Sequence, residues 1–294
     1  MSSLLPMLRH PGRAIATVLP FTFLLLSVAA FANAPQQNVD RVPSIDPDAD
    51  LLTPIEVHPN SPAPQPAPPP PPISGAPPLG TSFEGPNFDT NLTNTGGSVF
   101  IPPDPHGAAG PNHVVNVINV SINWYTKPGG TQQYNQSLRN FFAPLNPTTF
   151  TFDPKVIYDQ HSGRFVVITL ERVTSPQTSR ILVAVSDDSD PNGTWYFHAI
   201  NSIISIGGIA HWADYPGLGV DNQAVYITNN MFRFTNNAFG GVGLWIINKA
   251  PFYAGGAAAV TVHRPDIAGD FTMQPPHVFG AIAGSDMHQV SAGC

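Results

Sequence analysis

The pattern of apolar and polar residues from 152 to 200 predicts four short β-strands joined by tight turns. Two of the runs, RFVVITL and RILVAVS, are β-branched and apolar enough to be buried on both faces. Asp-Pro-Asn-Gly before the last run is a turn signal, because Pro fixes φ and Gly supplies positive φ. The strands are expected around residues 155–158, 164–170, 180–186 and 196–200. Together they would form one antiparallel meander, the size of a propeller blade.

Similar patterns lie on either side of this segment. From 114 to 125 apolar residues alternate with Asn and Ser, and Lys127-Pro128-Gly129-Gly130 then predicts a hairpin turn. Further strands are expected around residues 224–232, 243–248 and 258–263. The composition agrees, since 34 Pro, 25 Gly and only 11% charged residues suit an all-β domain rich in turns.

The three segments share a weak internal repeat. Each has an Asp at or near a Pro, a Gly-containing stretch and then a β-branched strand, starting at Asp104, Asp153 and Asp214. The aspartates are 49 and 61 residues apart, which is close to one four-stranded blade each. The predicted fold class is therefore all-β, with about three antiparallel, β-propeller-like blades.

Three blades do not close a ring that normally takes four to eight. The sequence ends after a Pro-rich turn, Gln274-Pro275-Pro276-His277, which looks like the approach to another blade. We therefore expect an apparently incomplete propeller, from a truncated chain with an open edge strand. Closure of the ring by oligomerisation is the alternative.

The turn from Ser189 to Trp195 resembles the Asp-box of sialidase-type propellers, Ser-x-Asp-x-Gly-x-Thr-Trp. The Gly lies three residues after the Asp here, against two in the box, but the interval from Asp to Trp is preserved. In that family the box is a folding device, so the resemblance implies a blade and no activity. The sialidase arginine triad and Phe-Arg-Ile-Pro motif are absent, with Phe232-Arg233-Phe234 as the nearest trace, so sialidase activity is not expected.

Residues 102–265 also resemble a group of secreted bacterial proteins of the sialidase-like superfamily. The segments that carry the resemblance are PPDPHGAAGPNH, FDPKVIYDQHSGRF and WADYPGLGVDNQAVYITNNMF. It implies export and a propeller, and the group has no settled activity to transfer to this chain.

The first 80 residues are expected to lie outside the folded domain. Arg9 and Arg13 precede an apolar stretch and two small-x-small sites, which predicts a signal peptide over 1–32. An uncleaved anchor is the alternative, because the stretch approaches the ~20 residues that a membrane span needs. Residues 33–80, with five consecutive prolines, predict a disordered, extended Pro-rich linker. Residues 81–294 would form the partial β-propeller-like domain.

Charge and cysteine content narrow the function classes. The chain has 12 Lys and Arg against 19 Asp and Glu, and loss of Arg9 and Arg13 with the signal peptide leaves ten against 19. There is no basic patch, so we expect no nucleic-acid partner and no membrane contact beyond the signal peptide. The only Cys is the last residue, which excludes an internal disulfide. The expected location is secreted or cell-surface, in an extracellular or periplasmic space.

The repeated aspartates Asp104, Asp153 and Asp214 are the candidate metal ligands. If the first strands of the blades converge, the three carboxylates meet and could hold Ca²⁺ together with backbone carbonyls. The alternative is that each Asp caps its own turn by accepting backbone N–H bonds, which is ordinary for Asp beside Pro. No other cofactor is indicated.

Signals for a catalytic centre are sparse. A glycosidase needs two facing carboxylates, and with only Glu56, Glu84 and Glu171 available such a pair would draw on Asp. No zinc-type His spacing, nucleophile elbow or phosphate-binding loop occurs. The four tryptophans, Trp124, Trp195, Trp212 and Trp245, are expected to pack between blades, with stacking on sugars as the alternative.

Two function classes stay open. The first is an exported, non-catalytic binding or surface-interaction module that recognises carbohydrate or an extracellular protein through its blade loops. The alternative is a polysaccharide-active hydrolase or lyase with an Asp-based site. The sparse Glu and the absent arginine triad favour the first class, so the chain is not expected to be an enzyme.

Overall fold

The computed structural model describes residues 80, 82–257, 260–263 and 271–280, and within them the chain is an all-β structure. The predicted signal peptide (1–32) and nearly all of the predicted linker (33–80) lie outside the described residues. Everything described below belongs to one unit of the chain, within Val42–Cys294. None of the described helices is long and apolar enough to cross a membrane.

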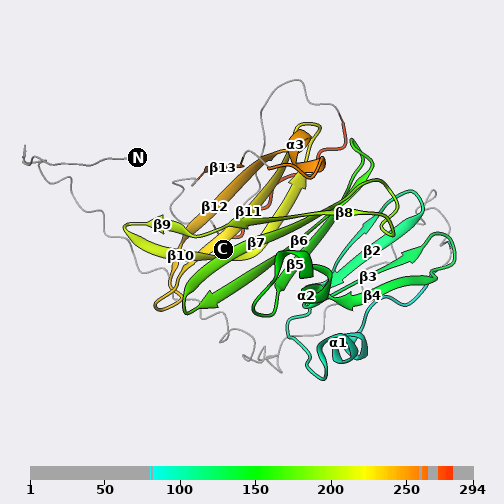
Figure 1. Cartoon of the computed structure of the whole chain (residues 1–294), viewed down its shortest axis with the longest axis horizontal. Helices are drawn as coiled ribbons and strands as arrows, with labels where there is room; N and C mark the ends of the chain where they lie inside the picture. Colours follow the sequence, from blue (N-terminus) through cyan, green and yellow to red (C-terminus); the bar gives the residue numbers. More distant parts are fainter. Residues whose placement is uncertain (1–79, 81, 258–259, 264–270, 281–294) are drawn as a thin grey trace, which may run out of the picture. The chain divides into compact units, whose positions relative to one another are not determined.

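The strands form three antiparallel sheets, which follow one another from cyan to orange in Figure 1. The first sheet has the order β1-β2-β3-β4, the second β5-β6-β7-β8 and the third β9-β10-β11-β12-β13, so each is a meander. The bounds are β1 His106–Ala109, β2 His113–Ile118, β3 Ser121–Thr126, β4 Gln132–Ser137, β5 Phe152–Asp159, β6 Arg164–Thr174, β7 Gln177–Ser186, β8 Trp195–Asn201, β9 Ile204–Ile206, β10 Ile209–Val220, β11 Ala224–Arg233, β12 Phe239–Asn248 and β13 Val260–His263. Three propeller-like blades therefore lie within the described residues, as predicted.

The second sheet is the meander that the sequence predicts for residues 152–200. The Asp159–Gly163 turn joins β5 to β6, and Gly163 has a φ of 67°. The turn 187–194 joins β7 to β8, where the Asp190 carboxylate accepts the backbone N–H of Asn192 at 3.0 Å. In the first sheet, Lys127–Gly130 joins β3 to β4, with φ of 106° and 65° at its two glycines.

Short helices occupy several connections, and the sequence patterns above do not predict them. The longest is α1 (Phe88–Thr95), where the Asn87 side chain and Thr90 form a capping box and Gly96 ends the helix at φ 72°. The others are α2 (Leu138–Phe141), the 3₁₀ turn η1 (Ala143–Leu145) and α3 (Lys249–Tyr253). The first regular element of the described part is therefore a helix, although the core of the domain is all-β.

The second sheet is buried on both faces, which explains the continuous apolar run in β6. Val166, Ile168 and Leu170 pack into a core shared with the third sheet. Phe165 and Val167 point the other way, into a core shared with the first sheet. Side chains alternate across a strand, so one run of β-branched residues serves both cores. The three sheets thus stack face to face, as blades do.

Candidate active site

The first strands of the three sheets lie side by side, with β5 between β1 and β10. One link between them is the His106 ring, whose Nδ1 lies 2.9 Å from the Val156 carbonyl oxygen. The three aspartates named from the sequence stand where these strands begin or bend, so the fold brings residues of three distant segments into one region.

The same backbone bulge occurs at this point in each sheet. In the second sheet, Asp153 and Pro154 are inserted between the pairs Phe152↔Leu170 and Lys155↔Ile168. In the third, Tyr215 and Pro216 are inserted between Asp214↔Asn230 and Gly217↔Thr228. Pro fits such a place because it has no N–H to donate to the ladder. Bulges of this kind redirect side chains and are frequent beside functional sites.

The first sheet repeats this arrangement just before β1. The Asn119 N–H donates to the Pro103 carbonyl, while His106 pairs with Val117, so Asp104 and Pro105 take the inserted place. The bulged residues Asp104, Asp153 and Tyr215 have φ values of 41°, 49° and 37°. The structural counterpart of the first two aspartates is therefore Tyr215. The repeat read from the sequence is wrong by one residue in the third sheet, where Asp214 precedes the bulge.

Hydrogen bonds through Asn119 and Tyr215 join the region across all three sheets. The Asn119 side chain donates to Asp104 Oδ2 at 2.8 Å and accepts the backbone N–H of Asp153 at 2.7 Å. The backbone N–H of Tyr215 donates to Asp153 Oδ2 at 3.0 Å. Asp153 is thus held from both sides. These bonds connect Asp104 and Asp153 with the backbone of Tyr215, the residue after Asp214.

The acidity of two of these carboxyls departs strongly from that of an ordinary Asp. Burial, then the charge of Asp214, then a hydrogen bond and the charge of Asp104 raise the pKa of Asp153 to about 8. Burial raises the pKa of Asp214 to about 6, opposed by a hydrogen bond with Asp153 and by the charge of Arg172. At neutral pH, Asp153 therefore carries a proton and Asp214 is largely ionised. Asp104, Asp153 and Asp214 are each half-buried.

Cations and aromatic rings surround the carboxyls. The Lys155 ammonium lies 4.7 Å from the ring centroid of Tyr215, and Tyr215 is 37% exposed. Burial lowers the pKa of Lys155, although the charges of Asp104 and Asp153 act in the opposite direction. The Arg172 guanidinium stacks 3.9 Å from the centroid of Trp212. An acid, a carboxylate, an ammonium and an exposed ring thus lie within one small region.

The predicted calcium site at Asp104, Asp153 and Asp214 stays a prediction. In the part of the chain that the structure describes, no group of three or more His, Cys, Asp or Glu side chains is arranged to hold a metal ion. Ca²⁺ prefers ionised carboxylates, so binding would have to displace the proton from Asp153.

The other residues named from the sequence have structural roles. Trp124 stacks on Tyr134 at 3.9 Å and donates Nε1–H to Asn192 Oδ1 at 2.9 Å, which ties the first sheet to the β7–β8 turn. Trp212 and Trp245 are buried and Trp195 is half-buried, so packing between sheets is confirmed for the tryptophans. Glu171 of β6 forms an ion pair with Arg180 of β7, within the second sheet.

Sequence patterns miss four residues of this region, namely Asn119, Lys155, Arg172 and Tyr215. Tyr215 could have been found by placing the repeat on the Pro that follows each bulge, because Pro105, Pro154 and Pro216 are equivalent. The other three give no comparable signal, since an Asn in a β-turn and a charged residue in a strand are common.

Comparisons with known proteins leave the family open. No protein-family model matches the chain, and no curated protein sequence matches it. Among solved structures, it is similar to a Penicillium chrysogenum α-L-arabinanase complexed with arabinobiose, at 12% identity and a TM-score of 0.39 over 60% of this chain and 54% of that one. It is also similar to a xylan β-1,4-xylosidase from Bacillus halodurans C-125, at 13% identity and a TM-score of 0.38 over 60% of this chain and 35% of that one. A third similar structure is the GH43_1 enzyme from Xanthomonas citri complexed with xylose, at 12% identity and a TM-score of 0.35 over 55% of this chain and 54% of that one. The chain spans about half or less of each, and similarities at this level assign no activity.

Proposed function

We propose that the chain carries the acid–base centre of an exported polysaccharide-cleaving enzyme, with Asp153 as the acid. The supporting observation is the junction of the three sheets, where Asn119 and the backbone N–H of Tyr215 hold Asp153 beside Asp104 and Asp214. Burial and the neighbouring carboxylates raise the pKa of Asp153 to about 8, and burial raises the pKa of Asp214 to about 6. Titratable groups whose environments separate their pKa values mark acid and base assignments. An Asp that only caps its own turn does not need a second carboxyl beside it or a raised pKa. Export follows from the signal peptide predicted for residues 1–32, and the Asp-box resemblance adds a propeller scaffold without adding chemistry.

In this proposal, the two carboxyls act as one proton-sharing pair. Hydrogen-bonded carboxyls are closer than the ~5–9.5 Å that separates the pair in ordinary glycosidases. Asp153 donates its proton to the leaving sugar oxygen as the glycosidic C–O bond breaks. Asp214 takes up a proton, from the attacking water in a hydrolase or from the sugar ring carbon in a lyase. Asp104 and the Tyr215 N–H position Asp153, while the exposed Tyr215 ring offers a face on which a sugar ring packs.

The test is a panel of polysaccharides incubated with the wild-type protein and with Asp153→Asn. We expect turnover that falls by ~10²–10⁴-fold in the variant, the usual contribution of a positioned general acid. Asp190→Asn, the same change in the β7–β8 turn, is the matched control and should keep full activity. Saturated products with new reducing ends would assign a hydrolase, and unsaturated products a lyase.

Asp214→Asn tests whether Asp153 and Asp214 act as a pair. Removal of the Asp214 charge lowers the pKa of Asp153, so the basic limb of the pH–rate profile should move to lower pH. Turnover that survives in Asp153→Asn would overturn the assignment of the acid. Saturable glycan binding without any product would replace the proposal by the non-catalytic binding module.

A further inference from the structure

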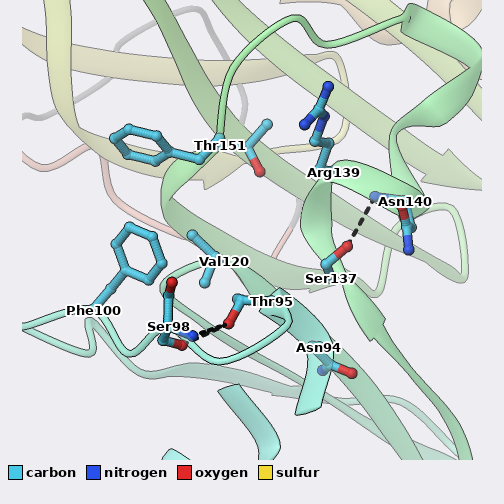
Figure 2. A pocket seen from close by; sticks show the side chains of 10 residues that line it. Asn94, Thr95, Ser98, Phe100, Val120, Ser137, Arg139, Asn140 and Thr151 are labelled. Atoms are coloured by element: carbon cyan, nitrogen blue, oxygen red, sulfur yellow. Dashed lines mark hydrogen bonds between the residues drawn. The ribbon is translucent and has the colours of Figure 1, made fainter. Parts of the chain in front are cut away.

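A second feature lies next to the aspartates, a cavity of about 290 Å³ between the end of α1, the β2–β3 turn and the segment before β5 (Figure 2). Val120, which follows Asn119 in the β2–β3 turn, lines it on one side. Thr151, two residues before Asp153, lines it on another. Its volume is at the lower end of the ~300–1,000 Å³ of small-molecule sites, which suits a single sugar unit.

The hydroxyl of Thr151 is a buried polar group that the protein leaves unsatisfied. Thr151 is 1% exposed, and its Oγ1 has no hydrogen-bond partner among the described residues. Figure 2 shows this hydroxyl directed towards the middle of the side chains that line the cavity. Buried polar groups in native proteins are nearly always paired. The unpaired hydroxyl therefore indicates a ligand atom as its partner.

The charge of the lining indicates an anionic ligand. Arg139 lines the cavity, and the lining contains no Asp or Glu. The Nε–H of Arg139 donates to the Pro147 carbonyl at 3.3 Å, and the Arg139 side chain is exposed. Within the described residues Arg139 forms no ion pair, whereas Arg180 does. A guanidinium that uses only its Nε–H within the protein keeps its terminal N–H groups for a ligand, and their planar arrangement matches that of a carboxylate.

Two phenylalanines give the cavity an apolar wall. The rings of Phe100 and Phe150 are 5.4 Å apart and tilted by 37°, and Phe150 is 54% exposed. An exposed ring beside amide and hydroxyl groups suits a sugar, which has apolar C–H faces and polar edges. The amides come from Asn94 at the end of α1 and from Asn140 in α2.

We propose that this cavity binds a hexuronic acid unit, with Arg139 on its carboxylate, Thr151 on a ring hydroxyl and the Phe100–Phe150 wall against its face. The proposed enzyme would then act on acidic polysaccharides such as polygalacturonate. The choice of substrate class rests on the proposed function, but binding in the cavity does not depend on it.

Calorimetric titration with trigalacturonate and with its fully methyl-esterified form tests the binding. We expect the acid to bind at least about tenfold more tightly, since the ester removes the charge-assisted pair. Arg139→Gln should weaken binding of the acid about tenfold and abolish the preference over the ester. Lys127→Gln removes one positive charge at the opposite end of β3 and should change neither affinity.

Thr151 is tested with one variant that keeps the volume of the side chain and one that keeps its hydroxyl. Thr151→Val removes the hydroxyl and should weaken binding of the acid several-fold, and Thr151→Ser, which retains it, should restore most of the affinity. Equal affinity of the wild-type protein for acid and ester would overturn the inference, as would unchanged binding in Arg139→Gln.

The outcomes separate this inference from the proposed function. Trigalacturonate should still bind to Asp153→Asn with wild-type affinity, because Asp153 does not line the cavity. Binding without turnover would retain the cavity as a uronate site and reject the enzyme. Turnover that needs Asp153 but is indifferent to Arg139→Gln, in KM and in preference for acidic substrates, would retain the enzyme and reject the uronate site.

Discussion

Replacement of Asp153 by Asn should stabilise the protein at neutral and alkaline pH while it removes activity. The pKa of Asp153 is raised from an ordinary 3.8 to about 8, a difference of roughly four pH units at ~1.4 kcal/mol each. The upper bound on the cost of ionising Asp153 in the folded protein is thus about 6 kcal/mol. Relaxation and sharing of the proton with Asp214 reduce it, and we expect roughly 2–3 kcal/mol.

The sign of the pH dependence follows from the proton count. The folded protein holds this proton up to about pH 8, whereas the unfolded chain releases it near 3.8. The free energy of unfolding therefore falls as pH rises through this window. Asn cannot ionise, yet its side-chain oxygen can still accept the Tyr215 N–H. The stability difference between Asp153→Asn and the wild type should then grow from about pH 4 to about pH 8 and stay constant above it.

Thermal unfolding at pH 5, 7 and 9 measures this difference. A gain of 2–3 kcal/mol corresponds to about 5–10 °C at pH 9 for a domain of this size. Asp190→Asn is the matched control, because the Asn192 N–H and the charge of His113 lower the pKa of Asp190. That variant should not gain stability as pH rises. Melting curves of Asp153→Asn that run parallel to the wild type from pH 5 to 9 would refute the raised pKa.

Two further predictions concern the buried ion pair and the calcium hypothesis. Lys249 is 4% exposed, forms an ion pair with the fully buried Asp159 and donates to the Asp221 carbonyl at 2.7 Å. Lys249→Met leaves the buried carboxylate without its cation, so it should lower the free energy of unfolding, measured in urea, by ~3–5 kcal/mol. The double variant with Asp159→Asn should recover much of this, and a single variant as stable as the wild type would contradict the reasoning. If the three aspartates bind Ca²⁺, excess Ca²⁺ should raise the melting temperature relative to chelator, and Asp153→Asn should abolish the rise. Equal melting temperatures in both conditions would exclude the calcium site.

The sequence predicts the blades better than it predicts their details. The meander of the second sheet is readable because each buried strand is β-branched and each turn contains Gly or Pro. The Asn119-Val120 turn between β2 and β3 is not readable, since neither residue is Gly or Pro and Val120 has a φ of 64°. A β-branched residue in that region is unusual, so only tertiary contacts explain it.

The sequence predicts that the three aspartates lie near one another, but it does not predict their pKa values. Repeated Asp and Pro place one residue per sheet near the first strand, and the sheets then bring them together. The pKa of Asp153 depends on distances to Asp104 and Asp214, which lie on other sheets. The one-residue offset at Tyr215 has the same origin, because only the ladder register shows which residue of Asp-Tyr-Pro occupies the bulge.

The bulge of the second sheet has a consequence for how the domain holds together. Burial of Asp153 and its neighbours Asp214 and Asp104 raise its pKa, and both neighbours belong to other sheets. A separated second sheet would therefore carry an Asp of more ordinary acidity. Protonation of Asp153 and association of the three sheets are therefore linked equilibria. A spectroscopic signal for the Asp153 proton would report whether the blades are assembled, and alkali, by removing that proton, should weaken their association.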